Sequence, residues 1–344
     1  MTPIAGGMAG ELREAAAAVR RQTQTLAEPL SALARRLIRQ RPRVIVTCAR
    51  GSSAHAATFG KHLFERHLGV PVAAAALNIA SVYRRSLDLR DQMLLVISQS
   101  GRSDDLIETA AMARAAGAIT AAIVNDLTSP LAQTVEIVLP LAAGPELSVA
   151  ATKSFVASLA ALLQLVATWT GDAAMAAACA RLPNRLAEAG ELDWSPAIEP
   201  LARATSMVAV GRGPTLAIAR EAALKLKETC DLHAEAFSAA EFRHGPIALV
   251  SSAYPILALA PTDESAVGLA KLVADLRRKG AHVFVTAPGS ARRGRRLPVL
   301  DCDHPDADAI CLIQSFYAFL VRLAAHRGTD VDRPRHLQKV TRTR

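Results

Sequence analysis

The chain has 344 residues, of which 51% are hydrophobic and 4% aromatic, and its formal net charge is +9. This length and hydrophobic content suffice for two domains with separate cores, and they favour a globular α/β enzyme. The scarcity of aromatic rings argues against nucleic-acid binding by base stacking, so the positive charge indicates an arginine-rich solvated surface or acidic partners such as phosphorylated metabolites.

A leading helix is predicted over residues 11–40, and after it apolar runs alternate with helical patterns. Alternating strands and helices predict a parallel sheet that helices cover on both faces. The predicted strands of this first set are Val44–Thr47, Pro71–Ala73, Leu94–Ile97, Ile119–Val124 and Ile137–Leu141.

The same pattern restarts in the second half of the chain. Met207–Val210 leads to a turn with Arg212 and then a helix, as the first strand leads to a turn with Arg50 and then a helix. The two arginines are 162 residues apart, and this offset indicates an internal duplication. The remaining predicted strands are Ile256–Ala260, His282–Thr286 and Pro298–Leu300. The sequence therefore predicts two tandem, doubly wound α/β domains of the flavodoxin-like kind, whose ligands bind beyond the carboxyl ends of the strands.

The domain boundaries follow from these two sets of strands. The stretch that begins at Pro183 and ends at Pro196 is the predicted linker. The predicted parts are a leading helix (1–34), a first, phosphate-binding domain (35–182), the linker (183–196), a second domain (197–328) and a C-terminal tail (329–344).

A polar segment, Ser98-Gln99-Ser100-Gly101-Arg102-Ser103, stands between a predicted strand and a predicted helix. Hydroxyl groups and unpaired first-turn N–H groups collect at such a junction, and the helix dipole favours negative charge there. The segment therefore predicts a phosphate site. The alternative is an ordinary serine-rich helix cap.

A cluster of charged residues follows the second arginine turn. Glu221, Lys225 and Glu228 lie at i, i+4 and i+7, so they share one face of a predicted helix. His244 follows on a Gly-Pro turn. A carboxylate beside a lysine, with a histidine nearby, suits proton transfer next to a carbonyl group. The alternative is a salt-bridged face exposed to solvent.

No metal, cofactor or membrane span is predicted. The five cysteines lack paired spacing, so neither a disulfide framework nor a zinc site is expected, and a reducing cytoplasm fits. Gly211-Arg212-Gly213 lacks the third glycine of a dinucleotide fingerprint. The longest apolar stretch, Phe155–Thr168, is predicted to be too short to span a bilayer, and the N-terminus has no signal pattern. We expect a cytoplasmic protein without nucleic-acid or membrane partners.

Six ordered segments resemble the sugar isomerase half of glucosamine-6-phosphate synthase, and on them the chain is identified as a member of the sugar isomerase (SIS) family. They are Ser98–Gly101, Gly144–Lys153, Ala223–Glu228, His233–Glu235, Glu241–Pro246 and Gly328–Arg335. The resemblance runs from about residue 51 to residue 339. One departure is Glu14-Ala15-Ala16, which stands where the family's leading helix carries Glu-Gln-Pro.

The resemblance implies a substrate site. The residues that correspond to the family's phosphate site are Ser53, Ser98, Gln99, Ser100 and Ser103. The residues whose backbone corresponds to the sugar contacts are Val149 and Ala150.

The resemblance also implies catalytic roles. Glu228, supported by Lys225, corresponds to the isomerising base, and His244 corresponds to the ring-opening histidine. Lys339 matches the lysine that can form an imine with the open-chain sugar, so the tail would complete the site. In relatives the histidine reaches the active site of the neighbouring subunit, which implies a homodimer with shared sites.

The glutamine-hydrolysing domain of the synthase is missing from this sequence, so glutamine is not expected to be the nitrogen donor. Stand-alone chains of this kind include glucosamine-6-phosphate deaminases, and that reaction is the function we expect. The alternatives are a deaminase or deglycase for another amino sugar phosphate, such as galactosamine 6-phosphate or fructosamine 6-phosphate, and a non-catalytic sugar-phosphate sensor.

Overall fold

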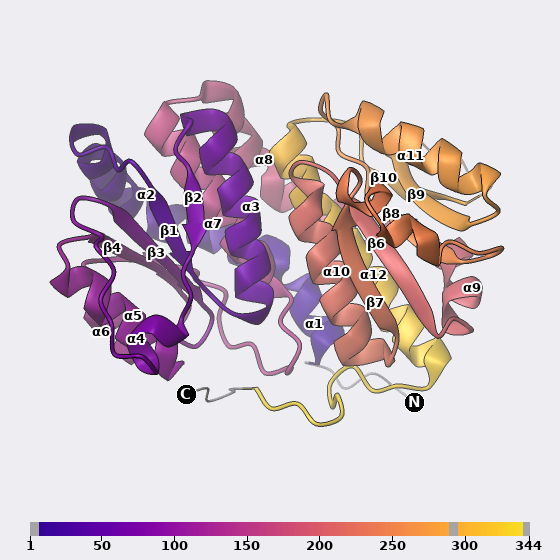
Figure 1. Cartoon of the computed structure of the whole chain (residues 1–344), viewed down its shortest axis with the longest axis horizontal. Helices are drawn as coiled ribbons and strands as arrows, with labels where there is room; N and C mark the ends of the chain where they lie inside the picture. Colours follow the sequence, from indigo (N-terminus) through magenta and orange to yellow (C-terminus); the bar gives the residue numbers. More distant parts are fainter. Residues whose placement is uncertain (1–6, 289–294, 340–344) are drawn as a thin grey trace. The chain divides into compact units, whose positions relative to one another are not determined.

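The computed structural model describes residues 7–288 and 295–339 (Figure 1). These residues form two compact units. The N-terminal unit comprises residues 17–146, 153–180 and 338–339. The C-terminal unit comprises residues 7–16, 147–152, 181–288 and 295–337. Each unit therefore includes short segments from outside its main stretch of chain.

The N-terminal unit is built on a five-stranded parallel sheet with the strand order β2-β1-β3-β4-β5. Its strands are β1 (Ile45–Cys48), β2 (Val72–Ala74), β3 (Met93–Ser98), β4 (Ile119–Val124) and β5 (Ile137–Pro140). Strand β1 lies between β2 and β3, so the chain leaves β1 and β3 toward opposite faces of the sheet. This is the predicted doubly wound, flavodoxin-like topology.

Helices cover both faces of this sheet. Helices α5 and α6 pack on one face, where Leu106, Ala110 and Leu131 join a core with strand residues Leu94 and Val96. Helices α3 and α7 lie together on the other face (Figure 1). The helices that lie mainly in this unit are α2 (Ala15–Arg39), α3 (Gly51–Leu68), α4 (Asn78–Ser81), α5 (Asp104–Ala115), α6 (Pro130–Thr134) and α7 (Lys153–Thr170).

The C-terminal unit repeats this plan with the strand order β7-β6-β8-β9-β10, again all parallel. Its strands are β6 (Ser206–Gly211), β7 (His233–Ser238), β8 (Pro255–Ala258), β9 (His282–Pro288) and β10 (Arg296–Val299). The offset of 162 residues that separates Arg50 from Arg212 also relates the start of β3 to the start of β8. The predicted internal duplication is thus confirmed by the topology.

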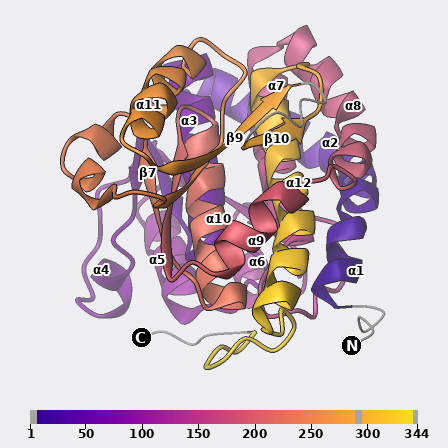
Figure 2. The same cartoon turned by 90° about the vertical axis from the view of Figure 1, so that its right-hand side faces the viewer.

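Helix α11 packs on one face of the second sheet, and helices α10 and α12 lie together on the other (Figure 2). The α-helices that lie mainly in this unit are α1 (Met8–Arg13), α9 (Ile198–Ala202), α10 (Thr215–Cys230), α11 (Ala266–Arg278) and α12 (Pro305–Arg327). Short 3₁₀ helices are η1 (Ser195–Ala197), η2 (Glu241–Arg243) and η3 (Pro246–Leu249).

Strand β7 is absent from the strands predicted for the second half. It lies at the edge of the sheet and pairs only with β6 among the described strands. Its first and third residues, His233 and Glu235, are exposed, so the segment lacks the continuous apolar run that marks the central strands. The sequence analysis named residues 233–235 only as a segment of the family resemblance, so this strand was not predicted.

The predicted helix ends and connections also differ in two places. The leading helix is two helices, α1 and α2, which Glu14 separates. Residues 183–189 of the predicted linker are helical, because α8 (Ala173–Ala189) continues through Pro183. A proline inside a helix removes one hydrogen bond and crowds the carbonyl four residues earlier, yet α8 continues past it.

Two described helices, α7 and α12, are long and apolar enough to cross a membrane by length and composition. The prediction that the apolar stretch at Phe155–Thr168 is too short therefore fails on length, since the helix extends to 18 residues. Of the tested windows, 83% of α7 and 72% of α12 are buried inside the structure, as is common for core helices of globular domains.

Candidate active site

The predicted phosphate residues meet at one edge of the N-terminal sheet. Ser53 lies in the first turn of α3, which follows β1, and Ser98–Ser103 joins β3 to α5. Because β1 and β3 are neighbouring parallel strands, both junctions lie at the carboxyl edge of the sheet. The chain departs from these two strands toward opposite faces, and such switch points are where ligands bind in doubly wound sheets.

Gly101 gives this loop its shape. Its φ of +63° is left-handed, and a Cβ placed there would lie 2.2 Å from Ser129 Oγ. The Gly101 N–H donates to Ser98 Oγ at 3.0 Å, and the Arg102 N–H donates to Ser100 Oγ at 3.3 Å. Each of these two oxygens accepts a loop hydrogen bond, so its own proton remains to be donated to an anion.

Ser103 is the N-cap residue of α5, but its side chain makes no capping hydrogen bond. The alternative interpretation of Ser103 as an ordinary helix cap is therefore not met. Its hydroxyl and the first-turn N–H groups of α5 are hydrogen-bond donors that need an acceptor. A phosphate could accept hydrogen bonds from both.

An ion pair that the sequence analysis missed joins the two junctions. Arg50, the residue before α3, donates from Nε to Asp105 Oδ2 at 2.5 Å. Asp105 is 1% exposed and lies in the first turn of α5. This pair ties the β1–α3 junction to the β3–α5 junction. Only the position of Arg50 just after the first strand could have suggested it.

The predicted charged face of α10 is buried, in the C-terminal unit. Lys225 Nζ lies 2.6 Å from Glu228 Oε2 and 3.5 Å from Glu221 Oε1. The side chains of Lys225 and Glu221 are 1% and 0% exposed, whereas that of Glu228 is 21% exposed. The alternative of a solvated salt-bridged face is therefore wrong. Buried charges are costly unless they are paired, so this arrangement depends on its ion pairs.

Glu221 has a second partner that no sequence pattern indicated. Tyr317 of α12 is fully buried, and its hydroxyl donates to Glu221 Oε1 at 3.1 Å. A connected chain of polar contacts thus runs from Tyr317 through Glu221 and Lys225 to Glu228. At its exposed end, Glu228 Oε2 is held by Lys225, and Oε1 has no partner among the described residues.

His244 lies on an exposed turn after η2. Gly245 follows it with a φ of +129°, a conformation that side chains rarely adopt. Within the described part of the chain, no hydrogen bond or ion pair joins the His244 ring to another side chain. The structure therefore places this residue in the same unit as Glu228 and shows no contact between the two.

The loop with Val149 and Ala150 belongs to the C-terminal unit, and two carboxylates hold it. Glu11 of α1, which is 2% exposed, accepts from the N–H groups of Leu147 and Ser148. Asp332 accepts from Ser148 Oγ at 3.2 Å and from the N–H at the start of α1 at 2.6 Å. The sequence analysis missed both supports, although Asp332 stands in one of the six quoted segments.

Lys339 lies in the N-terminal unit, where its Nζ is 3.5 Å from Glu146 Oε2. The carboxylate of Glu146 is buried and also accepts from the N–H and the hydroxyl of Ser154, at 3.1 and 2.5 Å. Glu146 therefore caps the first turn of α7 and binds the lysine at the same time. The candidate residues are thus divided: the phosphate residues and Lys339 lie in the N-terminal unit, and Val149, Ala150, Lys225, Glu228 and His244 lie in the C-terminal unit.

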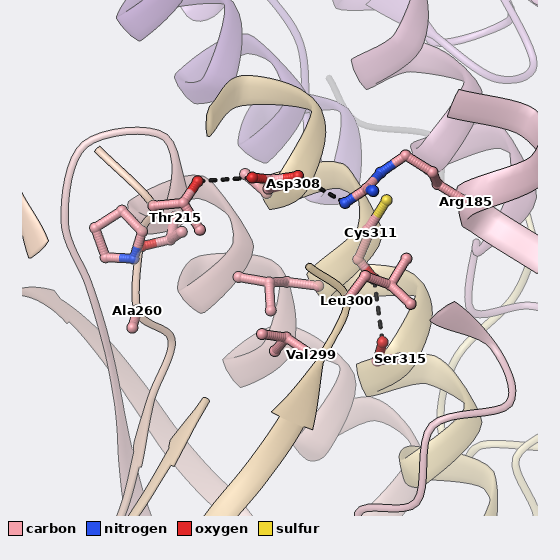
Figure 3. Close-up of a pocket in the computed structure, with 12 residues that line it drawn as sticks. Arg185, Thr215, Ala260, Val299, Leu300, Asp308, Cys311 and Ser315 are labelled. Carbon is pink, nitrogen blue, oxygen red and sulfur yellow. Dashed lines mark hydrogen bonds and ion pairs between the residues drawn. The ribbon is translucent and has the colours of Figure 1, made fainter. Parts of the chain in front are cut away.

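A small cavity in the C-terminal unit does not have the features of a substrate site (Figure 3). Its volume is about 20 Å³, room for about one water molecule. Asp308 there accepts from Arg185 Nη2 at 2.9 Å and from Thr262 Oγ1 at 2.8 Å, so its charge is already paired. Burial nevertheless raises the pKa of Asp308 above its ordinary value.

A family model described as the SIS domain matches residues 37–168 and 200–287. Glutamine–fructose-6-phosphate aminotransferase [isomerizing] of Symbiobacterium thermophilum is 33% identical over 324 residues, which cover 86% of this chain and 51% of the relative. The chain thus spans about half the length of the curated relatives it matches.

Solved structures extend the likeness over almost the whole chain. A chain from Silicibacter pomeroyi DSS-3, provisionally described as a phosphosugar isomerase, is 40% identical with a TM-score of 0.89, covering 94% of this chain and 99% of that one. Glucosamine-6-phosphate deaminase from Thermotoga maritima is 22% identical with a TM-score of 0.73, covering 96% and 100%, which shows a shared fold.

Proposed function

The chain belongs to the SIS domain family, and on this premise we propose that it is an amino-sugar-phosphate deaminase that converts glucosamine 6-phosphate and water into fructose 6-phosphate and ammonia. The observation that carries the proposal is the pair formed by Lys225 and Glu228. A buried ammonium holds one carboxylate oxygen at 2.6 Å, while the Glu228 side chain remains 21% exposed to solvent. A carboxylate fixed in this way can act as a general base.

The phosphate of the substrate binds at the loop after β3. The unused protons of Ser98 and Ser100, the hydroxyls of Ser53 and Ser103, and Gln99 supply neutral donors around it. Charge-assisted hydrogen bonds to an anion are stronger than neutral ones, so this loop anchors the substrate. The backbone at Val149 and Ala150 contacts the sugar.

Glu228 carries out the proton transfer. It removes the proton from C2 of the open-chain sugar and returns it to C1, and the intermediate between the two steps is an enolamine. Lys225 stabilises the negative charge that develops on oxygen. The resulting imine at C2 adds water and releases ammonia, which leaves fructose 6-phosphate.

Two further residues complete the proposal. His244, which is exposed and unpaired within the described residues, opens the pyranose ring of a substrate bound by the neighbouring subunit, so the enzyme acts as a homodimer. Lys339 contacts the open-chain sugar, either as a cation or as an imine. The proposed reaction uses no metal or cofactor, and we expect the enzyme to act in the cytoplasm.

The test is a substrate panel with the purified full chain. Ammonia and fructose 6-phosphate are measured with glucosamine 6-phosphate, galactosamine 6-phosphate, N-acetylglucosamine 6-phosphate and fructosamine 6-phosphate. Equal release of both products from glucosamine 6-phosphate alone supports the proposal. Turnover of a different compound in the panel would change the assigned substrate and leave the assigned site residues unchanged.

A second candidate is suggested by the curated relative, which is an isomerising aminotransferase. The same active site would then run in the direction of amino-sugar synthesis, with ammonia and fructose 6-phosphate as substrates. Glucosamine 6-phosphate formation from these two compounds, faster than its breakdown at matched concentrations, would favour this direction. Binding of sugar phosphates without turnover in either direction would indicate a sensor.

A further inference from the structure

A cationic cavity lies at the carboxyl edge of the C-terminal sheet. Its volume is about 300 Å³. The described residues that line it are Arg212, Ala239, Ala240, Arg243, Gly268 and Lys271. They come from the segments after β6 and β7 and from the first turns of α11. Three of the six are cations, and none is a carboxylate. We call this the cationic cavity.

The three cations lack counter-charges in the described part of the chain. The guanidinium of Arg212 donates from Nη1 to the hydroxyl of Ser238 at 3.0 Å, which fixes its position without neutralising it. No ion pair joins Arg243 or Lys271 to a described carboxylate. Three like charges around one cavity repel one another, so an anion bound among them would be stabilised.

The internal duplication shows how this cavity differs from its counterpart. In the N-terminal unit, Arg50 is neutralised by Asp105 of α5. At the 162-residue offset, Arg50 corresponds to Arg212 and Asp105 corresponds to Val267 of α11, whose side chain cannot pair with an arginine. The second copy thus keeps the arginine and loses its carboxylate.

The next position on the same helix face changes in the same direction. Thr109 of α5 lies one turn after the carboxylate and is buried, and it corresponds to the exposed Lys271 of α11. Between the two copies, this helix face therefore changes from one negative charge to one positive charge. The position that corresponds to Arg243 is Ser81, so the third cation is also particular to the second copy.

We propose that the cationic cavity is a second phosphate site, which binds the phosphate group of a small phosphorylated metabolite. Guanidinium and ammonium groups are the side-chain donors that bind phosphate oxygens most strongly, and three positive charges exceed the charge of a phosphate dianion. The volume is within the range of small-molecule sites, and the carboxyl edge of the sheet is where such folds bind ligands. This site is formed by other residues than the loop after β3, and its existence does not depend on the proposed catalytic reaction.

The experiment is calorimetric titration of the full chain at constant ionic strength, with inorganic phosphate in one arm and glucose 6-phosphate in the other. We expect two sites per chain in the wild type. Lys271→Glu should weaken the second site about tenfold or more, equivalent to about 1.4 kcal/mol, and leave the first unchanged. Ser98→Ala should weaken the first site and leave the second unchanged. The two arms tell free phosphate from a phosphorylated sugar.

Lys279→Glu is the matched control, because it makes the same charge change just after the same helix and outside the cavity. It should leave both sites unchanged. Arg212→Gln is a second variant that should weaken the same site as Lys271→Glu, in case the first fails to fold. A single wild-type site that responds only to Ser98→Ala overturns the proposal. Equal weakening by Lys271→Glu and Lys279→Glu also overturns it, since the effect would then be general charge attraction.

Discussion

The two units have the same strand order and are related by an offset of 162 residues, yet their candidate residues differ in chemistry. The N-terminal unit presents hydroxyls and backbone N–H groups, and its arginine is neutralised by Asp105. The C-terminal unit presents charged groups, with Lys225 and Glu221 buried on α10. Two copies of one fold thus carry different candidate groups, so the fold alone does not determine the chemistry of either unit.

The candidate groups of the two units also differ in how they affect the free energy of unfolding. The donors after β3 are uncharged and need no partner ion to fold. The buried charges on α10 do need their partners, because an unpaired buried charge is strongly destabilising. Substitutions in the two units should therefore have different consequences: loss of substrate affinity in the first, and loss of turnover or stability in the second.

The largest expected effect is that of Glu228→Gln. It removes the proposed base and should lower kcat about 10²- to 10⁴-fold, while the KM for glucosamine 6-phosphate changes little. Steady-state kinetics and thermal unfolding of the same preparation measure this. Glu235→Gln, on the exposed edge strand β7, is the control and should behave as the wild type. A fully active Glu228→Gln enzyme would rule out the assigned base.

Ser98→Ala tests the proposed phosphate site of the N-terminal unit. It removes one donor to the phosphate and the acceptor of the Gly101 N–H. Since a hydrogen bond to a charged group contributes about 1.5–3 kcal/mol, KM should rise about 10- to 100-fold with a smaller change in kcat. The control is Ser265→Ala, at the start of α11 in the second copy. Equal effects of both variants would contradict the assignment of the substrate phosphate to the loop after β3.

Next in size is Glu11→Gln, which weakens the support of the loop with Val149 and Ala150. The loss of a charged acceptor for two N–H groups should lower the free energy of unfolding by about 1–3 kcal/mol and raise KM. Denaturant unfolding and kinetics check this. Glu28→Gln, on the exposed side of α2, is the matched control. If the loop is held in some other way, the two variants will be indistinguishable.

Tyr317→Phe tests how much the buried charges on α10 contribute to stability and turnover. Glu221 would lose one donor, so stability should fall by about 1 kcal/mol and kcat by about 5-fold. A positioning role also predicts a shifted pH profile of kcat, because Glu221 contacts Lys225, which in turn holds Oε2 of the proposed base Glu228. The exposed Tyr83 provides the control variant Tyr83→Phe. A stability loss with an unchanged pH profile would leave Tyr317 with a structural role only.

The smallest effect concerns thiol reactivity. Burial raises the pKa of Cys48, Cys179 and Cys311 to about 12 and that of Cys230 to about 11. At pH 8 these groups stay protonated, so iodoacetamide should modify only the exposed Cys302, in the C-terminal unit. Mass spectrometry of native and denatured chains measures this. Because the folded pKa values exceed the unfolded value of 9.0, the free energy of unfolding should fall as the pH rises above about 9.

Local patterns made much of the fold predictable. Ile119–Val124 was predicted with the bounds that β4 has, because every residue of a central parallel strand is buried and the run is continuous. The shared face of Glu221, Lys225 and Glu228 was predictable because helical periodicity is local. Strand β7 was not predictable, because alternate residues of an edge strand can be polar.

The supports of the site depend on contacts between distant parts of the chain. Tyr317 and Glu221 are 96 residues apart, and Ser148 and Asp332 are 184 residues apart. No spacing rule within a helix or strand links such positions. Burial of the charged face on α10 likewise could not be predicted from the sequence, because the same spacing occurs on solvated helices.

The inclusion of short, distant segments in each unit has a consequence for how the chain can be divided into fragments. Residues 147–152 belong to the C-terminal unit, although Glu146 before them and Lys153 after them belong to the N-terminal unit. A gene fragment encoding residues 181–337 alone would lack this loop and the α1 helix with Glu11. The second domain made from such a fragment would lack the hydrogen bonds that Glu11 accepts from Leu147 and Ser148.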